Sequence, residues 1–69
     1  MTPRVGGRYR TRAGYVAEVT SFDADPLHVW PWKGAVKIGT RVEQVSWTLA
    51  GLGWGPYMDD PIDLVEELT

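Results

Sequence analysis

The prediction on which the rest of the fold depends is a β-hairpin in residues 7–22, which read Gly7-Arg8-Tyr9-Arg10-Thr11-Arg12-Ala13-Gly14-Tyr15-Val16-Ala17-Glu18-Val19-Thr20-Ser21-Phe22. β-Branched and aromatic residues recur in both halves, and Gly14 separates them, which is typical of two strands joined by a tight turn. A three-residue turn over residues 12–14, with Gly14 left-handed, sets Tyr9 opposite Ala17. It gathers Tyr9, Ala17 and Val19 on one face and leaves the Arg side chains facing solvent, with Arg8 across from Glu18.

Further strands are predicted from the spacing of Gly, Pro and Asp, which interrupt the chain at intervals of about eight to twelve residues. Residues 27–30 are predicted to form a strand that ends at Pro31, because proline cannot donate a hydrogen bond to a sheet. Residues 34–38 and 42–48 are predicted to form a second hairpin around Gly39-Thr40, at the centre of the sheet. A short strand is predicted over residues 52–54.

The last segment, residues 62–68, fits two structures. Asp60 could cap a short helix that starts at Pro61, whereas the alternation of apolar residues favours a closing strand. We favour the strand, with the short C-terminal helix as the alternative. The predicted fold is mainly β, a small antiparallel and strongly bent sheet or SH3-like barrel of about five strands.

Length and composition limit the class of protein. The 69 residues suffice for one domain, residues 1–69, whose core would be filled by four Trp, three Tyr and one Phe. With no Cys, the chain has no disulfide and no thiolate metal site, which fits a reducing cytoplasm. No apolar run approaches the ~20 residues that span a bilayer, so we expect a soluble, cytoplasmic protein without a membrane partner.

Charge is distributed unevenly although the net charge is only −2. The N-terminal part carries four arginines and the C-terminal part five acids, namely Arg4, Arg8, Arg10 and Arg12 against Asp59, Asp60, Asp63, Glu66 and Glu67. Chain ends in small domains often lie close together. We therefore expect the two ends to lie side by side and to neutralise each other in part.

The residues needed for catalysis or metal binding are scarce. The chain has one His, His28, and the segment Asp23-Ala24-Asp25 lacks the Gly and the distal Glu of a calcium loop. Ser21 and Ser46 lie in strand patterns without a nucleophile motif. We expect no catalytic residue, metal or cofactor, and no enzymatic activity.

The aromatic residues are the strongest candidates for a binding site, because Trp and Tyr dominate both protein cores and the energetic centres of interfaces. Trp47 is predicted to lie in the core. Trp30 and Trp32 flank Pro31 in a predicted loop or edge, so an exposed Trp30-Pro31-Trp32 contact site is one interpretation and core packing is the other.

A nucleic-acid site is a second interpretation. Basic and aromatic residues alternate in the first hairpin, and a single-stranded nucleic acid uses such a pattern for phosphate contact and base stacking; these residues are Arg8, Arg10, Arg12 and Tyr15. The calculated pI of about 5.1 speaks against it. An acidic edge would instead suit a basic groove on a nucleic-acid-binding partner.

Several segments resemble a recurrent family of small, mostly uncharacterised phage and prophage proteins: residues 7–14, Trp32-Lys33-Gly34-Ala35-Val36, Ser46-Trp47-Thr48 followed by Gly51, and Pro61-Ile62-Asp63-Leu64-Val65-Glu66. Because these motifs are turns and strand aromatics, the resemblance implies a shared fold more than a shared activity. Small phage proteins of this kind include anti-CRISPR and other anti-defence inhibitors, which cover a surface of a host complex.

The predicted function is therefore that of a phage-encoded, non-catalytic binding protein in the host cytoplasm. It would inhibit a host protein complex, of the CRISPR effector type, by blocking its nucleic-acid-binding surface. The predicted anchors are Trp30, Trp32 and Tyr57, and the predicted charged rim consists of Asp59, Asp60, Glu66 and Glu67. The alternatives are nucleic-acid binding through the Arg/Tyr hairpin and a homodimer that pairs through an exposed sheet edge.

Overall fold

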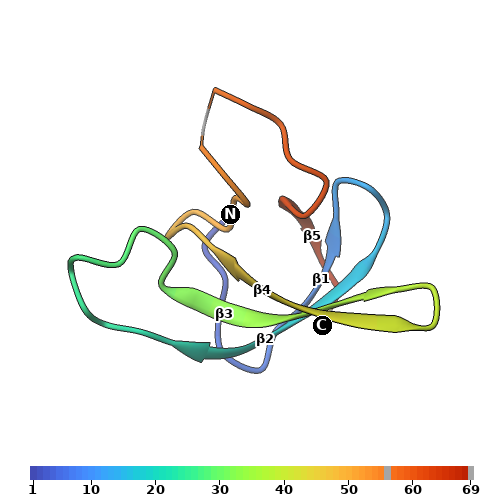
Figure 1. The fold of residues 1–69 in the computed structure, drawn as a ribbon, viewed down its shortest axis with the longest axis horizontal. Helices are drawn as coiled ribbons and strands as arrows, with labels where there is room; N and C mark the ends of the chain where they lie inside the picture. The colour runs from blue at the N-terminus through green and yellow to red at the C-terminus, as the bar shows by residue number, and fades with distance from the viewer. Residues whose placement is uncertain (56, 69) are drawn as a thin grey trace.

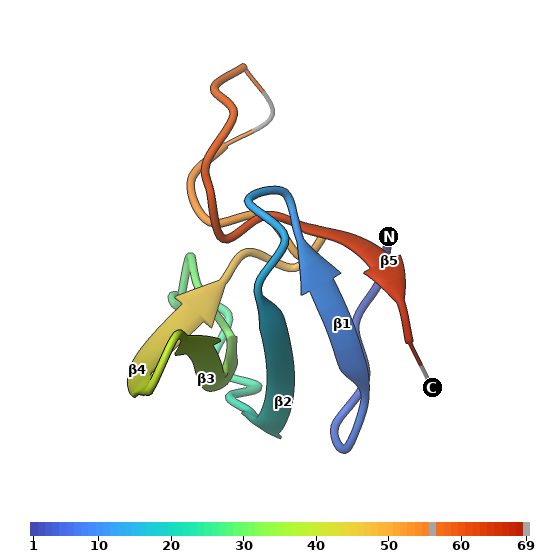
Figure 2. The ribbon, with the colours of Figure 1, turned by 90° about the vertical axis from the view of Figure 1, so that its right-hand side faces the viewer.

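Five strands form one antiparallel sheet in the computed structural model, which describes residues 1–55 and 57–68 (Figure 1). The strands are β1 (Arg8–Thr11), β2 (Val16–Phe22), β3 (Trp32–Ile38), β4 (Arg41–Trp47) and β5 (Leu64–Glu67). Their order in the sheet is β4-β3-β2-β1-β5, so β4 and β5 are edge strands and the sheet does not close. Figure 2 shows how strongly the sheet twists between these edges. The mainly β, bent-sheet prediction is confirmed.

The first hairpin has the predicted register. Tyr9 faces Ala17 and Arg8 faces Glu18. Gly14 has a φ of 90°, and its amide donates to the Thr11 carbonyl at 2.9 Å. This left-handed residue allows a three-residue turn, which fixes the faces to which the side chains of β2 point as far as Val19, where the register with β3 shifts.

Gly14→Ala is expected to destabilise the protein by about 1 kcal/mol, because an L side chain in the left-handed region costs roughly that amount. No atom lies within 4 Å of the position a Cβ would occupy, so the cost is conformational and not steric. Gly14→Asn should lower the stability less than Gly14→Ala does, since Asn tolerates the left-handed conformation. Urea unfolding of the three proteins measures the difference, and equal stability of wild type and Gly14→Ala would contradict the turn assignment.

The second hairpin forms around Gly39-Thr40 as predicted, with Ile38 opposite Arg41 and Trp32 opposite Trp47. Its predicted place in the sheet is wrong. β2 is the central strand, and β4 lies at an edge. The reason is that β5 adds to the free side of β1, which moves the centre of the sheet towards the first hairpin.

The strand predicted over residues 27–30 is also wrong, because this segment belongs to a loop between β2 and β3. In this loop, aspartate side chains accept hydrogen bonds from backbone amides that would otherwise be free to pair with another strand. Asp25 N donates to Asp23 Oδ1, and Leu27 N donates to Asp25 Oδ1, both at 3.0 Å. Such local bonds compete with sheet formation. The strand begins only after Pro31, at Trp32.

The C-terminal segment forms the closing strand, and the alternative of a short helix is wrong. Asp60 does act as a local cap, since its Oδ1 accepts the Ile62 amide at 3.0 Å. The chain then extends instead of coiling, because Leu64 N donates to Gly51 O at 2.9 Å and β5 pairs with β1.

The short strand predicted over residues 52–54 is absent from the described chain, where these residues lie between β4 and β5.

The core lies on one face of the sheet and is built around aromatic rings. Trp47, Tyr9 and Trp32 are buried, and each satisfies its polar atom: Trp47 Nε1 donates to Ile62 O at 2.8 Å, Trp32 Nε1 to Leu49 O at 3.1 Å, and the Tyr9 hydroxyl accepts Arg4 N at 2.9 Å. The remaining buried apolar side chains are Ala17, Val19, Val36 and Leu64. Burial of Trp47 confirms its predicted core position. The described residues include no helix that is long and apolar enough to cross a membrane.

Candidate binding surface

The most exposed aromatic side chains lie on the segment between β4 and β5, which projects beyond the end of the sheet in both views (Figures 1 and 2). We call residues 53–55 and 57–60 of this segment the arm. Tyr57 is 100% exposed, Met58 61% and Trp54 56%. A bridge between Gly55 and Met58 brings the two sides of the arm together. The arm thus presents apolar side chains to solvent at its tip.

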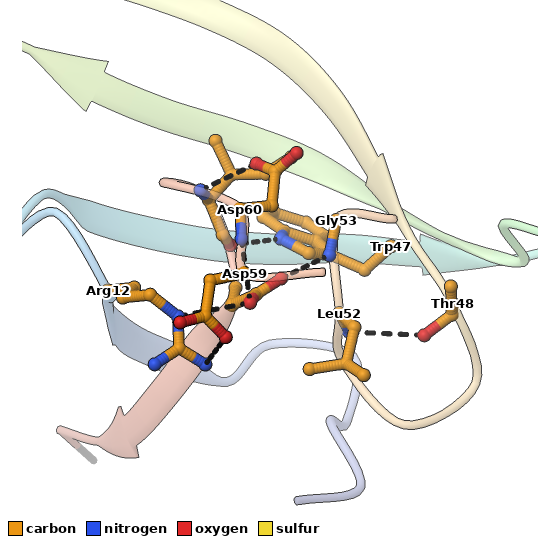
Figure 3. A network of polar contacts seen from close by, with 9 residues as sticks. Arg12, Trp47, Thr48, Leu52, Gly53, Asp59 and Asp60 are labelled. Atoms are coloured by element: carbon orange, nitrogen blue, oxygen red, sulfur yellow. Dashed lines mark hydrogen bonds and ion pairs between the residues drawn. The ribbon is translucent and has the colours of Figure 1, made fainter. Parts of the chain in front are cut away.

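The base of the arm is clamped by one buried carboxylate, that of Asp63, which is 1% exposed. Its Oδ1 accepts the Gly53 amide at 2.8 Å, and its Oδ2 accepts the Asp60 amide at 3.0 Å and Arg12 Nε at 3.1 Å. In Figure 3, Gly53, Asp60 and Arg12 lie around one point, at which the dashed lines of these three hydrogen bonds meet. Because Gly53 and Asp60 begin and end the arm, a single side chain holds both of its ends.

We call the Asp63 carboxylate and its three hydrogen-bond donors the clamp. The electrostatics of the clamp favour the charged form of this carboxylate. Burial by itself raises the pKa of Asp63, but the hydrogen bonds from the Gly53 and Asp60 amides, together with the bond and the charge of Arg12, outweigh burial. The pKa of Asp63 is therefore lower than that of an ordinary aspartate. At neutral pH the clamp is ionised.

Trp30 supports the arm from the side. Its Nε1 donates to Gly53 O at 3.0 Å, and its ring lies 5.6 Å from that of Trp54, between ring centroids. Trp30 is partly buried, whereas Pro31 and Trp32 are buried. The exposed Trp30-Pro31-Trp32 contact site is thus not formed, because Trp32 starts β3 on the core face opposite Trp47. Of the predicted anchors, only Tyr57 is fully accessible.

The predicted acidic rim is divided between two places. Asp59 is exposed on the arm, 3.8 Å from Arg12, and Asp60 is partly buried at the arm's base. Glu66 and Glu67 lie on the edge strand β5, where they pair with Arg10 at 3.9 Å and with Arg4 at 2.9 Å. These pairs confirm that the basic and acidic ends of the chain lie together and partly neutralise. Only Asp59 and Asp60 adjoin the arm.

The alternative nucleic-acid set is not brought together on one surface. Arg8 and Arg10 point to the exposed face of the sheet, but Tyr15 is partly buried and packs against the core. Arg12 is engaged by Asp63 and Asp59 at the base of the arm. The alternation of basic and aromatic residues, from which this nucleic-acid site was predicted, is the ordinary alternation of side chains along a strand. It sends the Arg and the Tyr side chains to opposite faces of the sheet.

Sequence reasoning missed the clamp and Met58. Asp63 was counted only as part of the acidic end. The available signal was the spacing of Asp60, Pro61 and Asp63, in which a turn-forming aspartate is followed three residues later by a second one. Neither the partner Arg12 nor the burial of Asp63 follows from that local pattern.

The described residues contain no group of three or more His, Asp or Glu side chains arranged to hold a metal ion. Comparison of the chain with protein-family models, with curated protein sequences and with solved structures finds no match. The fold and the surface described above define a small open β-sheet domain with a clamped, projecting arm. The resemblance to small phage proteins stays a prediction.

Proposed function

We propose that the chain is a non-catalytic binding protein whose contact element is the arm. The observation that supports this is a fully exposed Tyr57 on a segment whose two ends are held by the buried Asp63. Tyrosine is among the residues that most often dominate binding energy. A backbone that is already held in place loses less conformational entropy on association. The arm is therefore suited to enter a concave surface of a partner.

The chemistry of the arm favours a protein partner with an apolar pocket edged by basic residues. Tyr57 and Met58 supply the apolar contact, and the exposed carboxylate of Asp59 lies next to them in the chain. Complementary charge accelerates encounter and selects the partner. A groove that binds nucleic acid is basic, so a nucleic-acid-binding groove of a host defence complex, of the CRISPR effector type, would supply the charge that complements Asp59. Together with the resemblance to small phage proteins, this supports an inhibitor that blocks such a groove.

Tyr57→Ala is expected to weaken binding to the partner at least tenfold, about 1.4 kcal/mol, because it removes the central anchor. The tagged protein is incubated with nuclease-treated lysate of a bacterial host that carries a CRISPR system. The retained effector is then assayed for DNA binding with increasing amounts of wild type or variant. Wild type should abolish DNA binding near one equivalent, and Tyr57→Ala should require at least ten times more.

Val42→Ala is the matched control, since Val42 is a 61% exposed apolar residue of the edge strand β4 that lies outside the arm. It should inhibit like wild type. Failure of the wild type to inhibit DNA binding by any retained effector would overturn the inhibitor proposal. Equal inhibition by wild type and Tyr57→Ala would show that the arm is not the contact element.

A further inference from the structure

The face of the sheet opposite the core carries a second surface, which is separate from the tip of the arm and meets the arm only at its base, at Gly53 and Trp54. Cross-strand pairing arranges its side chains in three rows: Arg10-Val16-Lys37-Val42, Arg8-Glu18-Ala35-Gln44 and Ser21-Lys33-Ser46. None of these side chains is buried, whereas their neighbours on the other face form the core. The sheet therefore has one covered face and one open face.

The open face is basic although the whole chain is acidic. Its rows hold four cations, Arg8, Arg10, Lys33 and Lys37, and one acid, Glu18. Arg10 lies 3.9 Å from Glu66 of β5. Within the described chain, no ion pair engages Arg8, Lys33 or Lys37. Three cations are thus available to an anionic ligand.

Three neighbouring hollows lie between these cations and the two tryptophans Trp30 and Trp54, whose rings are in tilted contact. A hollow of about 440 Å³ lies between Trp30, Trp54, Lys33 and Ser46. A second, of about 310 Å³, shares Lys33 and Ser46 with the first and adds Thr20. A third, of about 290 Å³, shares Thr20 with the second and reaches Arg8, Lys37 and Val42. The first two hollows share Lys33 and Ser46, and the last two share Thr20, so the three adjoin one another over the open face; we call them together the trough, whose third hollow is also lined by Glu18.

We infer that this trough binds single-stranded nucleic acid, with phosphates at Arg8, Lys33 and Lys37 and a base stacked on Trp54. Lys33 and Lys37 are four residues apart on β3, about 13 Å along the strand, so they can neutralise successive parts of an extended backbone. Trp54 is 56% exposed, contacts Trp30 and lines the first hollow together with Lys33, so its ring is accessible beside the basic rows. Basic grooves with aromatic platforms are the combination that binds single strands without sequence preference.

The combination of cations with an exposed Trp ring favours nucleic acid over an acidic peptide as the ligand of the trough. A peptide of Asp and Glu would need the cations but would gain little from the exposed face of Trp54. A nucleic acid needs both, because stacking on an aromatic ring contributes about 1–3 kcal/mol per base. The inference does not depend on the arm's tip, since neither Tyr57 nor Met58 lines the trough.

The test is fluorescence anisotropy of a labelled oligothymidylate of about 16 nucleotides, titrated with the protein at several salt concentrations. We expect Lys33→Ala with Lys37→Ala to weaken binding at least fivefold and to reduce the slope of log affinity against log salt by about 1.4, or 0.7 for each lost phosphate contact. Trp54→Ala should weaken binding at least fivefold at all salt concentrations. Circular dichroism shows that each variant is folded.

Arg41→Ala is the matched control. Arg41 is an exposed cation of β4, but it pairs with Ile38 and so belongs to the other face. It should bind the oligonucleotide like wild type, and so should Tyr57→Ala, which separates this inference from the proposed function. The inference would be overturned if wild type did not bind the oligonucleotide at low salt, or if Arg41→Ala weakened binding as much as the lysine substitutions. It would also be overturned if polyglutamate bound as tightly, or if light scattering showed a homodimer that persists when the oligonucleotide is added.

Discussion

Asp63→Ala is expected to lower the free energy of unfolding by about 2–4 kcal/mol, because it removes a buried, ionised acceptor and leaves three partly buried donors without it. The carboxylate accepts from Gly53 N, Asp60 N and Arg12 Nε. A domain of this size is stabilised by roughly 3–10 kcal/mol in total, so the variant should be partly unfolded at 37 °C. Chemical denaturation followed by circular dichroism measures the loss. Asp59→Ala, which removes an exposed carboxylate of the same arm, should change stability by about 0.5 kcal/mol or less.

The stabilisation by Asp63 should depend on pH in a defined direction. Because its pKa is lowered in the folded protein, the unfolded chain takes up the proton first as the pH falls. The contribution is complete above the unfolded pKa of about 3.9 and is lost as the pH falls through the lower, folded value. The stability difference between wild type and Asp63→Asn should therefore shrink below about pH 4. A difference that stays constant down to the acid-unfolding limit would contradict the role of the ionised clamp.

Gly34→Ala is expected to lower the free energy of unfolding by at least about 3 kcal/mol, near the upper end of the cost of overpacking. A Cβ on Gly34 would overlap the backbone carbonyl oxygen of Glu18. This oxygen belongs to the central strand β2, next to the irregular register between Val19 and Ser21. A backbone atom cannot turn away as a side chain can, so β2 and β3 would have to separate.

Gly55→Ala provides the matched control for this prediction. No atom lies within 4 Å of the position that a Cβ on Gly55 would occupy, and its φ is not in the left-handed range. Thermal unfolding should give a melting temperature close to that of wild type for Gly55→Ala and a large decrease for Gly34→Ala. A Gly34→Ala protein that melts within a few degrees of wild type would show that β2 and β3 do not approach each other as closely as the structure has them.

The parts of the fold that depend on residues close together in the sequence could be predicted from the sequence. The register of the first hairpin follows from the position of Gly14, and the second hairpin follows from Gly39-Thr40. The start of β3 could not be predicted in this way. Pro31 is locally a strand breaker, whereas Trp32 joins the sheet because Phe22 and Trp47 flank it from distant parts of the chain.

The exposure of the candidate binding residues was predicted only in part for the same reason. Tyr57 and Asp59 were identified from residue type, and both are exposed on the arm. Trp32 has the same side-chain chemistry as Trp54 but the opposite environment, because the pairing of β3 with β4 sends it to the core. Composition identifies which side chains can anchor a partner. Only the tertiary fold determines which of them reach solvent.

The separation between the base and the tip of the arm has a consequence for how this domain can change. Asp63 fixes the two points at which the arm leaves and rejoins the sheet, and it does so through the backbone amides of Gly53 and Asp60. Those bonds do not depend on the side chains that the tip carries. The side chains of the tip can therefore be substituted while the framework beneath them stays the same, as the hypervariable loops of an antibody vary on a constant sandwich.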